Sequence, residues 1–177
     1  MNHDEIEFHI RAEQPNDAES VYRIHYEAFG EREEESKMAE RVRASKGYIP
    51  ELSLIATDRN GSVIGHALFS QAEVVDEDIR HEVIVLAPIA VKPGYQNQGI
   101  GGALIREGLR LADKRGNSHV FLIGHPAYYP KFGFEPARPY GFELKQFEVP
   151  NEVFMVKILS PNAGIKGELR YPQAFLD

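Results

Sequence analysis

The chain has 177 residues, 42% of them hydrophobic, which is enough for one globular domain with a single core. Its net charge of −7, from 27 acidic and 20 basic side chains, argues against a nucleic-acid-binding protein and favours a cationic partner. The absence of cysteine excludes disulfides, thiolate metal sites and cysteine nucleophiles. A polar, acidic N-terminus and no apolar run of about 18 residues predict a cytoplasmic protein that does not enter membranes.

Alternating apolar residues over 6–13 predict a first strand. Apolar residues at helical spacing then predict a helix that stops at Gly30, and helix formers over 31–46 predict a second helix. Two apolar runs follow, "LSLIAT" and "VIGHALFSQAEVV", with Asn60-Gly61 between them. Because Asn-Gly favours a tight hairpin turn, these runs are expected to be antiparallel neighbours.

A charged turn, "DEDIRHE", precedes the run "VIVLAPIAV" at 83–91, which is apolar on both faces and therefore predicts a central strand. Pro88 lacks an N–H donor, so we expect a bulge or an end of pairing there. A helix over 99–115 and a strand at "HVFLIG" come next, and they predict a right-handed parallel crossover. A short helix or turn, an extended piece and a strand at 153–159 follow.

The helix over 99–115 begins in the sequence "YQNQGIGGAL", with glycine at 99, 101 and 102. The first turn of a helix carries free N–H groups and a partial positive charge, and glycine lets a phosphate approach them closely. Alternatively, the glycines only allow the helix to pack tightly on the sheet. The dinucleotide pattern G-x-G-x-x-G fails at its third glycine, and the Lys-Ser/Thr of a mononucleotide loop is missing, which argues against a nucleotide-binding phosphotransferase.

Two motifs occur in this context: Gln96-x-x-Gly99-x-Gly101 after a strand that ends in Val91-Lys92-Pro93, and Tyr-x-x-x-Gly-Phe at Tyr129–Phe134. With the order of elements over 6–159, they resemble the GNAT-type N-acetyltransferase superfamily. The resemblance implies an α/β (α+β) acyl-CoA N-acyltransferase fold. Its mixed, mostly antiparallel sheet has about six or seven strands, flanked by about four helices and splayed between strands four and five. Residues 1–177 would form one domain, with 160–177 as a C-terminal extension.

The resemblance also implies an activity. The chain would move the acetyl group of acetyl-CoA, its co-substrate, to a primary amine by direct attack in a ternary complex. The acceptor would be a small molecule or a peptide, the chain a monomer or homodimer, and no metal is expected because the histidines lack metal-binding spacing. The alternative is a non-catalytic acyl-CoA-binding sensor or scaffold of the same fold, because no general base is evident.

The resemblance assigns roles to particular residues. Main-chain groups of residues 89–91 would hold the pantetheine and acetyl groups, with an N–H of Ile89 or Ala90 meeting the developing oxyanion. Amides of residues 97–102 would hold the pyrophosphate, and Tyr129 would be the general acid for the departing sulfur. Tyr129 could instead be an aromatic residue that supports the short helix. The expected cofactor-binding residues are Ile89, Ala90, Val91, Gln96, Asn97, Gln98, Gly99, Ile100, Gly101, Gly102, His125 and Tyr129.

The base is the least defined part of the expected site. Val85 stands where histone-type members carry a glutamate. Glu82 is the candidate base, with Glu27 and His125 as alternatives acting through water, although each could also be a solvated or structural residue. The acidic run "EREEE" at 31–35 either attracts a cationic amine or forms a solvated helix start. The aromatic-rich segment from Pro139 onward would close over the acceptor cleft, cover the sheet or form a dimer contact.

Overall fold

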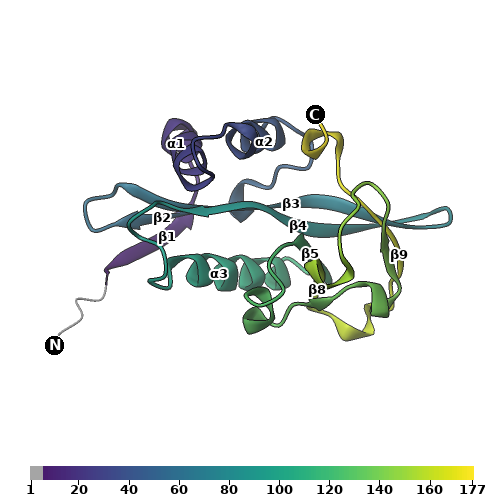
Figure 1. Ribbon diagram of the computed structural model, residues 1–177. Helices are drawn as coiled ribbons and strands as arrows, with labels where there is room; N and C mark the ends of the chain where they lie inside the picture. Colours follow the sequence, from purple (N-terminus) through teal and green to yellow (C-terminus); the bar gives the residue numbers. More distant parts are fainter. Residues whose placement is uncertain (1–5) are drawn as a thin grey trace.

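The computed structural model describes residues 6–177, and Figure 1 shows one sheet with helices on both of its faces. The helices α1 (Ala18–Ala28) and α2 (Glu34–Arg43) cover one face, and α3 (Ile100–Lys114) covers the other. The C-terminal end of the chain lies beside α2, where Arg41 Nε donates to the Ala174 carbonyl at 2.9 Å. Within the described residues, no helix has the length and apolar character needed to cross a membrane.

Nine strands form the sheet over the described residues, and most neighbours are antiparallel. The strands are β1 (Phe8–Ala12), β2 (Ser53–Asp58), β3 (Val63–Asp76), β4 (Ile79–Val91), β5 (His119–Ile123), β6 (Glu135–Pro136), β7 (Phe142–Leu144), β8 (Phe154–Ile158) and β9 (Gly167–Arg170). The main order is β1-β2-β3-β4-β5-β8-β6, while β9 pairs with both β3 and β7. The pair β4–β5 is parallel and joined through α3, so the parallel arrangement of the predicted crossover is confirmed.

The two hairpins differ in how well the sequence predicted them. The turn at Asn60-Gly61 joins antiparallel β2 and β3, as expected. The charged turn predicted before residue 83 is present but shorter, at residues 77–78, because β4 already begins at Ile79, which pairs with Asp76 of β3. Charged residues are tolerated there because this end of the hairpin is exposed, and Arg80 pairs with Glu73 across the strands at 2.7 Å.

The helix α2 starts later than predicted, at Glu34 rather than at residue 31. Gly30 and Glu31 both adopt left-handed backbone angles, with φ of 69° and 62°, which a continuing right-handed helix excludes. The segment 30–33 is therefore a connection between α1 and α2.

The C-terminal segment contributes to the sheet itself. Strand β9 pairs with residues 73–75 of β3, on the same strand but beyond Leu68, where the pairing of β3 with β2 stops. The described sheet therefore has nine strands rather than six or seven, with three α-helices rather than four, while the expected fold class is confirmed.

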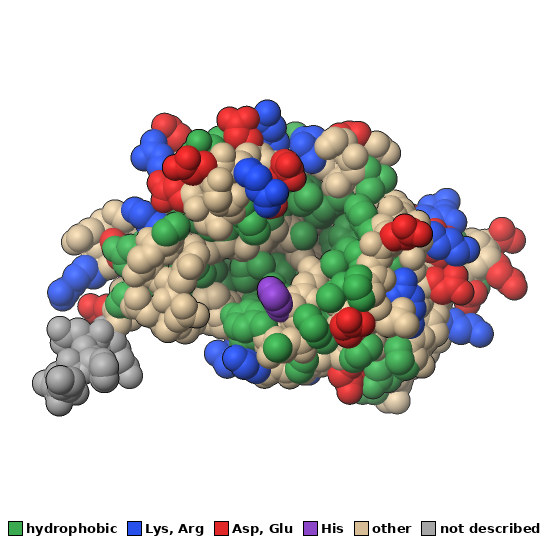
Figure 2. All heavy atoms as spheres, in the orientation of Figure 1, with side chains coloured by type: hydrophobic (Ala, Val, Ile, Leu, Met, Phe, Trp, Pro, Cys, Tyr) green, Lys and Arg blue, Asp and Glu red, His purple; other side chains and the backbone are tan. Residues whose placement is uncertain are grey.

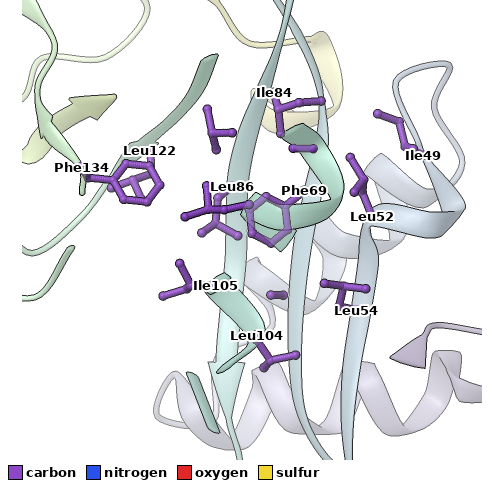
Figure 3. Packing of buried hydrophobic residues seen from close by; sticks show 14 of the residues in the cluster. Ile49, Leu52, Leu54, Phe69, Ile84, Leu86, Leu104, Ile105, Leu122 and Phe134 are labelled. Carbon is purple, nitrogen blue, oxygen red and sulfur yellow. The ribbon is translucent and has the colours of Figure 1, made fainter. Parts of the chain in front are cut away.

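Each face of the sheet has its own apolar core. Figure 3 shows the core on the α3 face, in which Leu104 and Ile105 of α3 lie close to Phe69 of β3 and Leu86 of β4. The opposite core lies beneath α2 and the C-terminal segment and is centred on rings such as Phe121. Strands β3, β4 and β5 are buried on both faces, which explains their continuous apolar sequences.

Candidate active site

Strands β4 and β5 separate soon after they meet. Their parallel ladder consists of Ile84 with Val120 and Val85 with Phe121, and within the described residues it goes no further. The edge of β4 that faces β5 is therefore unpaired beyond Val85. Figure 2 shows the same side of the molecule as Figure 1, hollowed between the α1–α2 layer and the α3 layer and lined largely by hydrophobic side chains.

A bulge interrupts β4 where it separates from β5. The β3–β4 register shifts between Ala67, which pairs with Ile89, and Phe69, which pairs with Leu86. Two residues of β4, one of them Pro88, thus oppose a single residue of β3. Beyond the bulge Ile89 and Val91 pack toward α3, while Ala90 points to the α1 face. The break predicted at Pro88 is present.

The glycine turn connects the end of β4 to α3. Asn97 and Gly99 adopt left-handed angles, with φ of 62° and 86°, and a Cβ on Gly99 would meet no atom within 4 Å. The Gln96 amide donates to the Val91 carbonyl at 3.1 Å, which closes the turn onto the strand. The first helical bond runs from the Ala103 N–H to the Gly99 carbonyl, so the N–H groups of residues 100–102 precede the helical ladder.

The other two glycines of this turn also make room for aromatic rings. A Cβ on Gly101 would lie 3.2 Å from the Tyr128 hydroxyl, and one on Gly102 would lie 3.3 Å from the Phe132 ring. Residue 99 thus leaves the turn open, whereas residues 101 and 102 make room for the aromatic side chains of the segment 128–132.

Tyr129 lies in this segment and is half-buried. Its ring lies against Gly124 at the end of β5 and meets the rings of Tyr128 and Phe134 edge-on, at centroid distances of 5.1 and 6.0 Å. Burial, with Tyr128 nearby, raises the pKa of the Tyr129 hydroxyl to about 12. The hydroxyl is therefore protonated at neutral pH and available as a donor.

The remaining predicted residues are distributed unevenly. His125 is exposed after β5, and its carbonyl accepts from the N–H groups of Tyr128 and Tyr129 at 3.2 and 3.3 Å. Glu82 is exposed opposite Glu73, on the order of 20 Å along the strand from Ile89 at the usual rise of a strand. The structure thus gathers residues 89–91, 96–102, 125 and 129 around one end of β4 and leaves Glu82 apart.

A buried polar chain on the α1 face was not singled out by the sequence analysis. His25 Nε2 lies 2.8 Å from His66 Nδ1, and His66 Nε2 lies 2.9 Å from the Ser53 hydroxyl, which donates to Glu13 at 3.1 Å. His66 is the cross-strand partner of Ala90. A signal did exist, because both histidines occupy core-facing positions of otherwise apolar patterns. Over residues 6–177, no three acidic or histidine side chains are grouped to hold a metal ion.

Comparisons with known proteins agree with this architecture. Residues 9–137 match the model of a family described as "Acetyltransferase (GNAT) domain". The chain is 33% identical over 168 residues to the uncharacterized N-acetyltransferase YhbS of Escherichia coli strain K12, covering 94% of this chain and 97% of YhbS. It is also 38% identical over 129 residues to the uncharacterized N-acetyltransferase YjhQ of the same strain, covering 73% of this chain and 69% of YjhQ.

Two solved structures extend the comparison. The crystal structure of E. coli YhbS in complex with CoA superposes with a TM-score of 0.89 at 28% identity, covering 100% of this chain and 96% of YhbS. A GNAT family acetyltransferase from Brucella melitensis in complex with acetyl-CoA has a TM-score of 0.77 at 29% identity, covering 96% of this chain and 98% of the other. The matched family model and these relatives agree with the sequence motifs and with the separation of β4 from β5. The chain therefore belongs to the GNAT family of N-acetyltransferases.

Proposed function

We propose that this chain transfers the acetyl group of acetyl-CoA to a primary amine by direct attack within a ternary complex. The observation that carries the proposal is the unpaired edge of β4 beyond Val85, which leads to the free N–H groups at the start of α3. The similar proteins solved with CoA and acetyl-CoA support the choice of co-substrate.

The diphosphate of the co-substrate would bind at the glycine turn. N–H groups of residues 100–102 offer donors at the positive end of the α3 dipole, and the open position at Gly99 leaves the approach free. The pantetheine arm would then lie along residues 89–91, adding hydrogen bonds to the free edge of β4 in the place of a neighbouring strand.

The chemistry requires a new C–N bond and a broken C–S bond. The acceptor first loses its ammonium proton to solvent, and the neutral nitrogen then attacks the thioester carbonyl, while a main-chain N–H of Ile89 or Ala90 meets the developing oxyanion. As the tetrahedral intermediate collapses, the Tyr129 hydroxyl gives its proton to the departing sulfur, and the nitrogen loses a proton to a base. Glu82 stays a predicted base that would have to act over a long distance, given its position at the other end of β4.

The acceptor is proposed to be a cationic small molecule or peptide with a primary amine. The net charge of −7 favours its approach, and Figure 2 shows charged side chains of both signs over α1 and α2, above the hollow. In the acidic run at 31–35, Glu33 pairs with Lys37 at 3.0 Å, so part of its charge is neutralised by a neighbouring lysine.

Titration calorimetry with CoA and with ATP tests the binding step, and release of the CoA thiol across a panel of primary amines tests the transfer. We expect heat with CoA alone and amine-dependent thiol release. Binding of CoA without release for any amine would instead support the sensor or scaffold alternative. No heat with CoA would contradict both.

A further inference from the structure

The buried chain His25–His66–Ser53–Glu13 has a defined direction. Arg43 holds Glu13 in a two-pronged ion pair, with Nε 2.9 Å from Oε1, and the oxygens of a carboxylate in such a pair accept hydrogen bonds. Ser53 must therefore donate to Glu13, as its geometry indicates. The Ser53 oxygen can then accept from His66 Nε2–H.

This direction fixes the tautomers of both histidines. With its proton on Nε2, neutral His66 has a lone pair on Nδ1, so the contact of 2.8 Å requires His25 to donate through Nε2–H. The remaining nitrogen, His25 Nδ1, is then a bare acceptor. It is buried and has no hydrogen-bond partner among the described residues. Buried polar atoms are nearly always paired, so an acceptor left open at the end of an ordered chain calls for a donor from outside the chain.

The chain ends next to the strand that is proposed to hold the thioester. His66 and Ala90 are directly paired, and side chains of paired residues point to the same face of a sheet. That face is covered by α1, which packs across both β3 and β4 and carries His25. The bare nitrogen therefore lies on the side of β4 opposite to α3, away from the turn that is proposed to hold the diphosphate.

We propose that the hydrogen-bonded chain His25–His66–Ser53–Glu13 is a proton relay for the acceptor amine. His25 Nδ1 is its receiving atom, and one water lies between this nitrogen and the amine. The inference rests on the proposed transferase function. After the C–N bond forms, the cationic nitrogen of the intermediate gives a proton to the water, and the water gives one to Nδ1. The imidazolium that forms is stabilised through Nε2–H and His66 by the carboxylate of Glu13, and it later returns the proton to solvent.

The environment of the two rings agrees with this role. Burial, with the Arg43 guanidinium nearby, lowers the pKa of His25 to about 4, and burial lowers that of His66 as well. Both rings are therefore neutral at neutral pH, and the lone pair of His25 Nδ1 is available.

The cationic nitrogen of the tetrahedral intermediate is a stronger acid than an alkylammonium ion, because the carbon bonded to it also carries oxygen and sulfur. The charged and titratable groups around the chain are Arg43 from α2, Glu13 after β1, His66 from β3 and Tyr48 before β2.

The variant His25→Gln separates a relay from a structural role. Glutamine can place its Nε2–H near His66 Nδ1 and so keep the internal hydrogen bond, but it has no basic lone pair. We expect kcat to fall roughly 10²-fold, with the Kd of acetyl-CoA within about twofold of the wild type and the acidic limb of the kcat–pH profile lost. The control is His9→Gln, an exposed substitution on β1, which should retain wild-type turnover.

A measurement without turnover completes the test. Long-range ¹H–¹⁵N spectra of the free protein should show His25 as the Nε2–H tautomer, with its signal assigned by its loss in His25→Gln. An Nδ1–H tautomer would overturn the relay whatever the activity, and so would wild-type kcat in folded His25→Gln. A wild type that releases no thiol with any amine would instead defeat the proposed transferase function itself.

Discussion

The Tyr129 ring lies directly against Gly124, so closely that a Cβ on residue 124 would overlap the ring. Gly124 follows the last residue of β5, and Tyr129 is the first residue of the short helix that comes next. Only a residue without a side chain at position 124 leaves Tyr129 in this place. We therefore expect Gly124→Ala to displace the ring and to lower kcat about tenfold or more, because small misplacements of a reacting group are costly.

A double variant checks that this effect passes through Tyr129. If it does, adding Gly124→Ala to Tyr129→Phe should lower thiol release little further, since the group being displaced is already absent. If the loss of thiol release in the double variant equals the two single losses combined, Gly124 does not act through Tyr129.

Tyr129→Phe should lower kcat roughly 10²-fold while the Kd of acetyl-CoA stays within about twofold, because the hydroxyl acts on the leaving sulfur. The raised pKa, about 12, adds a second expectation. The hydroxyl keeps its proton through about pH 10, so the wild-type rate should show no decline there from loss of this proton. Tyr140→Phe, at an exposed tyrosine, is the control. Equal losses of turnover and affinity in Tyr129→Phe would indicate a packing role.

Gly99 and Gly61 provide a matched pair for testing the glycine turn. Their φ angles are 86° and 83°, and a Cβ at either position would meet no atom within 4 Å, so alanine suffers similar backbone strain of roughly 1–2 kcal/mol at each. Only Gly99 precedes the free N–H groups of α3. We expect Gly99→Ala to weaken acetyl-CoA binding about tenfold by calorimetry, whereas Gly61→Ala should lose stability alone. Equal affinities in the two variants would remove the turn from the binding site.

Local patterns predicted most of the elements, and the misses have physical causes. Helix α3 and strand β5 follow directly from periodicity, and Asn60-Gly61 fixed the hairpin. Strand β9 is only four residues long, "GELR", with no local strand signal. It exists because the exposed edge of β3 and strand β7 offer partners that are distant in sequence.

The site residues also differ in whether the sequence could predict them. Residues 96–102 and Tyr129 belong to contiguous motifs, so their positions could be predicted before the fold was known. The polar chain could not, because Glu13, His25, Ser53 and His66 are scattered over four elements or their ends and meet only when α1 closes on the sheet. The two histidines stand inside apolar patterns, but nothing in the sequence indicates that they meet each other, Ser53 and Glu13.

Gly108 shows how closely α3 approaches the sheet. A Cβ there would overlap the ring of Phe69, which is fully buried at the centre of the core in Figure 3. In an open helix, alanine would gain about 1 kcal/mol over glycine, but forcing extra volume into a packed core costs about 1–3 kcal/mol. We expect Gly108→Ala to lower the free energy of unfolding in urea by up to about 2 kcal/mol. Adding Phe69→Leu should destabilise less than the sum of the two single changes, whereas a stabilised Gly108→Ala would contradict this packing.

The buried histidines predict a loss of stability in mild acid. A histidine in the unfolded chain titrates near 6.5, whereas in the folded protein the pKa of His25 is about 4. Between these values the unfolded chain binds more protons than the folded one, so the free energy of unfolding should decrease as the pH falls from about 6.5 toward 4. For His25 alone, the full decrease is roughly 3 kcal/mol.

Urea unfolding at a series of pH values measures this decrease. His25→Gln removes the titrating ring while it can keep the bond to His66, so its stability should fall less steeply over the same interval, and the curves of the two proteins should converge or cross as the pH drops. His9→Gln, at an exposed position, should follow the wild type. Parallel curves for wild type and His25→Gln would mean that the pKa of His25 is the same in the folded and unfolded protein, which would contradict the effect of its burial.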